Sequence, residues 1–392
     1  MRFRRDAPRM LVYAVIIVVV MMAVLSNRLF SGLTSSVEED QFKLMRSILE
    51  SSLRSAEGRA VARAEMLANL PTLKQMFAAR DRKRLLAEYG PMFRVQKEKH
   101  GVDQTQFHTP PAVSFLRLHS PKLYGDDLSS FRPMVVAVNQ DRLARKGVAI
   151  ARAGPAVFGV VPVQDAAGKH IGSLDVGIDF GSVLNNLKSD YDLEAALFIE
   201  EEPLRRFATA VSGEVLDKEN RVGKYLKFHS THWALMQGLM TSKDLAAIQE
   251  PVKYTREAMG VSYGVLLVPL RNDTGKSLGV IAVARDFSGS RAASRRSLVW
   301  QTLIALFAIV LLSGAVSVVL RGFLLRPLEA LGNSFGALAK GEREMAIEDV
   351  DTLCEELQVL AHHHESLRTQ QESASAQKPY SRASAQEKGD ES

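Results

Sequence analysis

Five polar residues between positions 117 and 152 could together bind a small anion. Arg117 and His119 lie two residues apart in a segment of strand composition, so both side chains are expected on one face of a strand. Arg132, Asn139 and Arg152 complete the set. Because a guanidinium group can donate two parallel hydrogen bonds to a carboxylate, the set predicts a site for a carboxylate or a similar anion.

The same arginines have an alternative, structural use as ion-pair partners of Asp126 and Asp127. The sequence leaves both uses open. The segment Gly125–Leu128 (GDDL) could also suggest a metal loop, but two adjacent carboxylates point in different directions. We therefore expect a turn or a helix cap there.

Other candidate chemistries lack a required residue or spacing. Gly168-Lys169 and Gly275-Lys276 do not follow the Gly-x4-Gly-Lys-Ser/Thr spacing of a phosphate loop. The three histidines at 362–364 would fan around a helix, which predicts a solvated patch rather than a metal site. No catalytic constellation emerges, and no basic stripe with interleaved aromatic residues suggests nucleic acid. We predict a protein that is not an enzyme and has no metal or cofactor.

Two uncharged apolar segments, residues 10–27 and 297–320, predict transmembrane helices. At ~1.5 Å per residue they would reach roughly 27 and 36 Å, against a hydrocarbon core of about 30 Å. A secretory signal is the alternative for the first segment. That segment is long for a signal, however, and no clear small-x-small cleavage site follows it before Arg28.

Charge and cysteine content predict the orientation and the compartment. Four arginines in the first nine residues place the N-terminus in the cytoplasm. Residues 28–296 would then be periplasmic or lumenal, and the C-terminus would return to the cytoplasm with the one cysteine, Cys354. An outer domain without a disulfide suits a bacterial periplasm. We predict a two-pass protein of the bacterial inner membrane or of a membrane derived from it.

A twenty-residue stretch occurs twice. VPVQDAAGKHIGSLDVGIDF (161–180) aligns without a gap to VPLRNDTGKSLGVIAVARDF (268–287) at an offset of 107 residues. The first copy has Asp and Gly near the middle and the second has Asn, Asp and Gly, as hairpin turns require. We expect each copy to be the closing hairpin of one of two related modules.

The remaining periodicities predict a mixed α+β chain. Three-and-four spacing indicates helices over about 31–70 and, from Pro71, about 72–100. A more helical stretch is expected near 232–250. The segments with strand composition are 112–119, 134–140, 147–154, 157–163, 171–180, 193–201, 206–213, 261–270 and 277–287.

The chain resembles double Cache chemoreceptors over roughly residues 30–290. The segment FHTPPAVSFLRLHSPKLYGDDLSSFRPMVVAVN (107–139) is similar to the family's Phe-Leu-Arg…Gly-Asp-Asp-Leu-Ser…Arg…Asn signature. GVAIARAGPAVFGVVPV resembles the segment that follows it. After the second span, Arg326-Pro327-Leu328 and Gly341-Glu342 resemble the first helix of a HAMP linker, although the second helix lacks the usual Asp-Glu-x-Gly.

The resemblance implies an α+β fold with a long N-terminal helix and two tandem Cache (PAS-like) antiparallel-sheet modules, flanked by two transmembrane helices. The predicted divisions are a cytoplasmic N-terminus (1–9), a first span (10–27), a periplasmic helical stalk (28–105), a membrane-distal Cache module (106–190), a membrane-proximal Cache module (191–292), a second span (297–320), HAMP-like cytoplasmic helices (321–368) and a disordered tail (369–392).

The resemblance also implies an extracytoplasmic sensor that forms a homodimer and binds a small molecule in the distal module. Arg117, His119, Arg132, Asn139 and Arg152 would then contact an anionic or amino-acid-like ligand. Two positions depart from the family pattern. An acidic residue is common where this chain has Ala149, and an arginine where it has Phe158.

Two functions therefore stay open. About 70 residues follow the second span, too few for a methyl-accepting, kinase or cyclase output. The first hypothesis is a sensor that acts through a cytoplasmic signalling partner. The second is a non-signalling scaffold or positioning protein derived from a chemoreceptor, with magnetosome membranes as an example by analogy.

Overall fold

The computed structural model describes residues 3–246, 248–340 and 355–376. They form two units. The larger unit comprises Leu33–Ala293, and the other contains the described parts of residues 1–32 and 294–392.

The larger unit is built along one helix. Helix α1 (Phe3–Ala68) enters this unit at Leu33, and α2 (Pro71–Ala78) and α3 (Arg82–His100) follow it. The side chain of Asp81 accepts a hydrogen bond from the Arg84 N–H (3.0 Å) and caps α3. The helix predicted for residues 72–100 is therefore two helices with a turn at Asp81.

The first module comprises residues 102–191. Its antiparallel sheet has the strand order β2-β1-β5-β4-β3. Its elements are β1 (Val102–Thr109), β2 (Val113–Arg117), α4 (Pro133–Asp141), β3 (Arg145–Ala151), β4 (Gly154–Gln164), β5 (His170–Asp179) and α5 (Phe180–Tyr191).

The second module comprises residues 193–287. Its antiparallel sheet has the order β7-β8-β6-β11-β10-β9. Its strands are β6 (Glu194–Glu200), β7 (Arg221–Val222), β8 (Tyr225–Ser230), β9 (Val252–Ala258), β10 (Val261–Arg271) and β11 (Ser277–Asp286). Its helices are α6 (Glu201–Phe207), α7 (Trp233–Leu239), α8 (Ser242–Leu245) and two 3-10 turns, Gly213–Leu216 and Lys218–Asn220.

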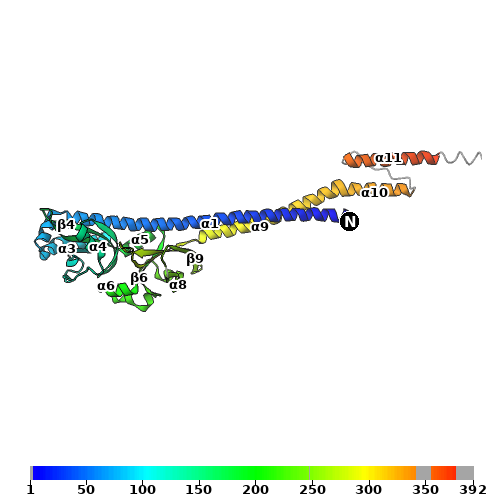
Figure 1. The fold of residues 1–392 in the computed structure, drawn as a ribbon. Helices are drawn as coiled ribbons and strands as arrows, with labels where there is room; N and C mark the ends of the chain where they lie inside the picture. The colour runs from blue at the N-terminus through cyan, green and yellow to red at the C-terminus, as the bar shows by residue number, and fades with distance from the viewer. Residues whose placement is uncertain (1–2, 247, 341–354, 377–392) are drawn as a thin grey trace, which may run out of the picture. The chain divides into compact units, whose positions relative to one another are not determined.

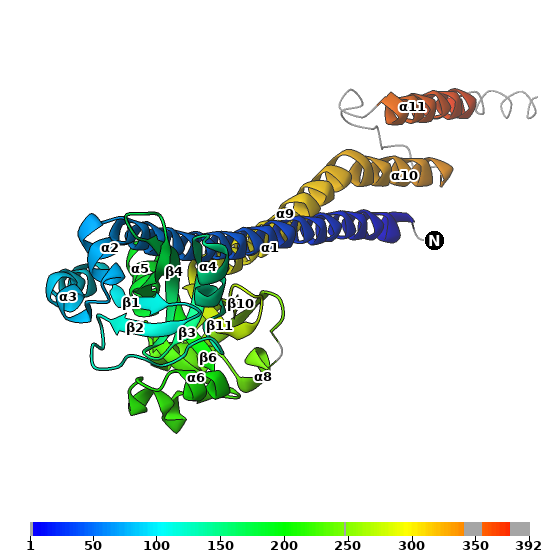
Figure 2. The same ribbon diagram turned by 60° about the vertical axis from the view of Figure 1, so that its left-hand side comes forward.

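The two modules lie one after the other along α1 (Figures 1 and 2). One hydrophobic core joins α1 to both sheets and includes Leu174 of β5 and Ile281 of β11. The opposite faces have separate cores. Helix α4 covers the first sheet with Met134 and Val138, and α7 covers the second with Leu235. Each sheet is therefore the middle layer between α1 and helices of its own module.

The two copies of the repeated sequence form equivalent hairpins, β4–β5 and β10–β11. In each turn one side chain, Asp165 or Asn272, accepts hydrogen bonds from the backbone N–H groups two and four residues later. Gly168 and Gly275 both take a left-handed φ, 79° and 82°, which glycine adopts without strain. The predicted pair of closing hairpins is confirmed at the level of individual hydrogen bonds.

Each copy ends by starting a helix. The side chain of Asp179 accepts from the Ser182 N–H (2.9 Å) at the beginning of α5. The side chain of Asp286 accepts from the Ser288 N–H (2.6 Å), where α9 (Ser288–Val319) begins. The shared Asp-Phe ending is thus a strand-to-helix junction in both modules.

Several local predictions were wrong. Residues 134–140 form α4 rather than a strand, because Pro133 at the first helical position fixes φ while Met134 and Val138 share one buried face. The predicted strand at 206–213 is the end of α6 and a turn. β1 lies partly inside the predicted helical stalk (28–105), and its polar sequence VDQTQFHT hid it.

The other unit contains apolar helices. Arg9–Leu29 of α1, and a stretch within Arg296–Ala339, are long and apolar enough to cross a membrane. Helix α9 continues through a π-helical segment, Leu320–Leu325, into α10 (Arg326–Ala339).

The last described helix, α11 (Glu355–Ala376), packs on α10 through Leu331, Leu357 and Ala361. The solvated histidine patch holds for His362 and His363, but His364 is buried edge-on to Phe335. Residues 369–376 of the predicted tail (369–392) are helical, and Cys354, Gly341 and residues 377–392 lie outside the described residues.

Gly159 lets α1 touch the first sheet. A Cβ atom added there would lie 2.2 Å from the Val61 nitrogen and 2.5 Å from the Ala60 carbonyl carbon. Since these are backbone atoms, they cannot rotate away. We predict that Gly159→Ala lowers the free energy of unfolding by about 1–3 kcal/mol or more. Thermal unfolding of the intact chain in detergent would measure it.

Gly58→Ala is the matched control, because an added Cβ meets nothing within 4 Å on that exposed face of α1. This change should stabilise the helix by up to about 1 kcal/mol. Equal effects of the two substitutions would contradict the close contact at Gly159.

Candidate functional site

The first module carries a polar patch on the sheet face that α4 covers. Arg117, Gln106 and Asp175 face one another across β2, β1 and β5, so their side chains share one face. A second row lies beside them, made of Ser114, His108 and Ser173. We call these six residues the polar face. All are at most 3% exposed.

One corner of the polar face is a pair of arginines on a single carboxylate. Arg117 donates from Nη1 and Nη2 to the two carboxylate oxygens of Asp126 (2.8 and 2.9 Å). Arg152 donates from Nε to Oδ2 of the same residue (3.3 Å). Burial opposes the charge of Asp126, but the bidentate hydrogen bonds from Arg117 outweigh it, so the pKa of Asp126 is lowered.

The other corner is a buried triad. Arg132 donates from Nη2 to Oδ2 of Asp175 (2.5 Å), and Nε2 of His108 lies 3.0 Å from the same oxygen. Burial alone would raise the pKa of Asp175, but the charge of Arg132 and the hydrogen bonds from His108 and Arg132 lower it to about 2. Burial lowers the pKa of His108 despite Asp175, so the imidazole is neutral and donates from Nε2.

The polar face is incompletely hydrogen-bonded. Among the described residues, Oδ1 of Asp175, Nδ1 of His108 and Nε2 of Gln106 are buried and have no hydrogen-bond partner. The same holds for the hydroxyl oxygens of Ser114 and Ser173. Buried polar atoms in native proteins nearly always have partners, so this face gathers an unusual number of unused donors and acceptors.

Two predicted site residues are held elsewhere. The strand predicted for 112–119 ends at Arg117, and the imidazole of His119 accepts a hydrogen bond from the Thr105 N–H (3.3 Å), next to Phe93 of α3. The expectation that Arg117 and His119 alternate along one strand was therefore wrong. Asn139 donates to the Pro111 carbonyl (3.0 Å) and lies 3.0 Å from His170.

The two departures from the family pattern have structural counterparts. The ring of Phe158 lies under the guanidinium group of Arg132, 4.2 Å from its carbon to the ring centroid. This cation–π contact holds Arg132 toward Asp175. Ala149 lies on the same side, where its small side chain lines a cavity between the modules.

Sequence reasoning missed Asp175, and the repeat contained the signal. Position 175 is an aspartate in the first copy, and its counterpart 282 is alanine. Ser173 likewise corresponds to Val280. In the second module Val280 and Ala282 belong to the apolar core under α7. The polar face is thus specific to the first module.

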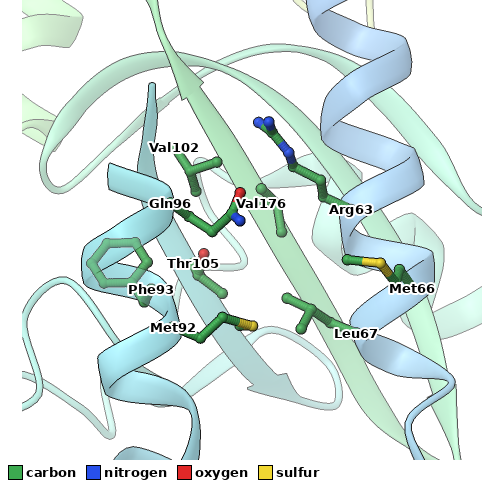
Figure 3. Close-up of a pocket in the computed structure, with 9 residues that line it drawn as sticks. All are labelled: Arg63, Met66, Leu67, Met92, Phe93, Gln96, Val102, Thr105 and Val176. Atoms are coloured by element: carbon green, nitrogen blue, oxygen red, sulfur yellow. The ribbon is translucent and has the colours of Figure 1, made fainter. Parts of the chain in front are cut away.

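A second hollow lies on the opposite side of the first sheet, between α1 and α3 (Figure 3). Met92 and Leu67 approach each other there, and Arg63 donates to the His100 carbonyl (3.3 Å). Its volume is about 30 Å³, the space of about one water molecule.

Two antiparallel-sheet modules on one long helix, with a buried polar face in the first, define a double Cache sensor domain. Residues 36–288 match the dCache_3 family, described as a double sensory domain of two-component sensor kinase. The chain belongs to this family. By this description the matched domain is sensory.

Solved structures of similar domains include the ligand-binding domain of the Campylobacter jejuni chemoreceptor Tlp3 with 4-methylisoleucine (10% identity, TM-score 0.38, covering 66% of this chain and 92% of that one). The sensory domain of the same receptor with isoleucine has 12% identity and a TM-score of 0.38 (68% and 98% covered).

The Vibrio cholerae LuxQ periplasmic domain has 12% identity and a TM-score of 0.37 (64% and 98% covered). At these values the structures carry no argument about this chain's ligand. No curated protein matches the sequence.

Replacing the central carboxylate should destabilise the first module. Asp175→Asn leaves Arg132, which is 1% exposed, without a counter-charge. We expect the free energy of unfolding to fall by about 3–5 kcal/mol. The matched control, Asp103→Asn, breaks the exposed Lys97–Asp103 pair (2.9 Å) and should cost less than about 1 kcal/mol. Chemical denaturation of both variants compares the two costs, and similar losses would contradict a buried triad.

Acid should destabilise the fold through His119. Burial lowers the pKa of His119 to about 4, below the ordinary value of 6.5. The unfolded chain therefore takes up a proton first as the pH falls, and stability is lost between about pH 6.5 and 4. His119→Gln should flatten this dependence by up to about 1.4 kcal/mol per pH unit. Unfolding curves of both proteins across that range test it, and an equal slope in the variant would contradict the role of His119.

Proposed function

We propose that the chain is a membrane-anchored sensor whose first module binds a small anion or zwitterion on the polar face and which acts through partner proteins. The observation that carries this proposal is the set of buried, unpartnered polar atoms on Gln106, His108, Ser114, Ser173 and Asp175. The second module, built from the same repeated hairpin, has apolar residues at the aligned positions.

The charge balance favours a ligand with a negative group. Three guanidinium groups, of Arg117, Arg132 and Arg152, meet two carboxylates, Asp126 and Asp175. With His108 neutral, one positive charge is left over. The carboxylate of a monocarboxylic acid would balance it, and a zwitterion would do so where its ammonium group lies away from the arginines.

Asp126 gives the site a built-in competitor. It is about one-third exposed and lies on the loop between β2 and α4, whereas Arg117 is almost fully buried. A ligand carboxylate could take the place of Asp126 on Arg117 and Arg152. His119 and Asn139 would then position the surrounding backbone.

The second hairpin supplies a route away from the site. Phe287, at the end of the second copy, packs edge-on against Phe42 of α1 with ring centroids 5.2 Å apart. Arg291, one turn later, donates to Glu38 (3.1 Å) and to the Thr255 hydroxyl (2.8 Å). A displacement of the second module would therefore reach both chain segments that lead to the apolar helices.

We also propose that the chain forms a homodimer and binds a cytoplasmic partner, and two exposed surfaces support these associations. One face of α1 presents small side chains four residues apart, which suits close packing in a homodimer: Ser47, Ser51 and Ser55. On α10 and α11, exposed Leu328, Leu360 and Leu367 offer an apolar surface to a cytoplasmic signalling or scaffold partner.

A scaffold or positioning protein is the second candidate, for example one that organises internal membranes such as magnetosomes. One observation favours it. The arginines predicted to bind a ligand already have internal carboxylates at 2.5–3.3 Å. A module closed in this way could persist for shape and dimerisation alone. A fluorescent fusion spread evenly around the envelope would count against this candidate.

A ligand screen separates the two candidates. The intact chain in lipid nanodiscs would be screened by thermal shift against amino acids, organic acids and amines. We expect one class to raise the melting temperature by several degrees and Arg152→Ala to abolish the increase. Asp126→Asn should strengthen binding, because it removes the internal competitor. The control is Arg94→Ala, an exposed arginine on α3. A full panel without a shift would remove the sensor proposal.

The proposed topology can be tested with the native cysteine. Cys354 is the only cysteine and follows the second apolar helix in the sequence. If both termini are cytoplasmic, a membrane-impermeant maleimide will label Cys354 only after the inner membrane is permeabilised. Thr274→Cys in a Cys354→Ser background should be labelled without permeabilisation. The reverse pattern would invert the orientation.

A further inference from the structure

A cavity of about 180 Å³ lies between the two modules and is separate from the hollow under α1. The first module lines it with the segment before and at the start of α4, and with β3. The second module lines it with α6 and with the tip of the β10–β11 hairpin. Because both modules build it, a molecule held there would contact both.

The walls combine an apolar floor with charged groups at the rim. Phe131 of the first module stacks on Phe207 of the second, with centroids 4.9 Å apart and planes 11° apart. Met134 and Ala149 extend the apolar wall. Arg132 also lines the cavity, and its Nε is buried without a hydrogen-bond partner in the described chain.

The hairpin tip adds opposite charges. Asp273 and Lys276 are exposed, line the cavity, and have no ion pair within the described residues. The tip is fixed, because Asn272 forms a bridge with Val148 of β3 and caps its own turn. A rigid turn thus holds one carboxylate and one ammonium group beside an apolar wall.

We propose that this cavity is a second small-molecule site, for a zwitterion with an apolar side chain. Asp273 would repel a purely anionic ligand, and Lys276 and Arg132 would repel a purely cationic one. The ammonium group of a zwitterion would pair with Asp273, and its carboxylate would pair with Lys276 or Arg132. Its side chain would pack on Phe131 and Phe207. The volume limits the ligand to about the size of an amino acid. The proposal does not rest on ligand binding at the polar face.

The repeat supplies a matched control for the test. Thr274 at the tip of the second hairpin aligns with Ala167 in the first, and Lys276 aligns with Lys169. All four are exposed, but only the second hairpin lines the cavity. Thr274→Cys and Ala167→Cys, each in a Cys354→Ser background, would carry a trifluoromethyl tag on the intact chain in nanodiscs.

L-Phenylalanine and L-leucine are the probes. We expect saturable changes in the fluorine spectrum of the tag at 274 and none at 167. Phenylacetate and phenethylamine, which have one charge each, should bind at least tenfold more weakly. Concentrations up to about 10 mM would saturate a millimolar site, so the absence of any change at 274 would overturn the proposal.

Affinities measured by calorimetry locate the site. Lys276→Gln, Asp273→Asn and Ala149→Leu should each weaken phenylalanine binding at least tenfold, and Lys169→Gln should leave it within twofold. Arg117→Gln alters the polar face alone, so the response of the fluorine tag at 274 to phenylalanine should stay unchanged in that variant. Binding that is lost with Arg117→Gln but kept with Lys276→Gln would overturn the second site and support the polar face instead.

Discussion

The contact between α1 and Gly159 is the constraint on which the arrangement of the larger unit depends. Ala56, Ala60 and Ala64 are fully buried against the first sheet, and the sheet has no side chain at the closest point. Because the side chains on both surfaces are short, the backbone of α1 touches the backbone of the sheet, and α1 can pack in one position only. Further down the helix, Phe42 meets Phe287 of the second module. The two sheets are thus positioned by one rigid element rather than by a linker.

The buried charges of the polar face compensate one another. Burying Asp175 opposes its charge, and the compensation comes from Arg132, which Phe158 holds in place. Removing the charge of Arg132 or of Asp175 would leave the other charge buried without a partner. Arg117 and Asp126 differ in this respect, because the Asp126 side chain is about one-third exposed and can turn toward solvent. The buried Arg132–Asp175 pair is therefore fixed. At the neighbouring Arg117–Asp126 pair, an incoming carboxylate could replace Asp126.

Local sequence was informative where local chemistry decides the structure. The hairpin turns were predictable because Asp165, Asn272 and their glycines satisfy the turn without help from the rest of the fold. α4 was not, because its apolar composition suits a strand and only Pro133 and packing on the sheet make it a helix. The arginines of the site were recognised by type. Their partner Asp175 could be identified only by pairing across three strands, or by comparing the two copies of the repeat.

The bridge between Asn272 and Val148 has a consequence for the isolated first module. β3 is an edge strand, with a row of backbone N–H and C=O groups that no further strand satisfies. An open edge of this kind recruits strands from other molecules, which begins aggregation. The hairpin tip of the second module occupies part of this edge and blocks such growth. A chain truncated after residue 191 would therefore lose this protection together with the second module, and the β3 edge of its first sheet would be open to strands from other molecules.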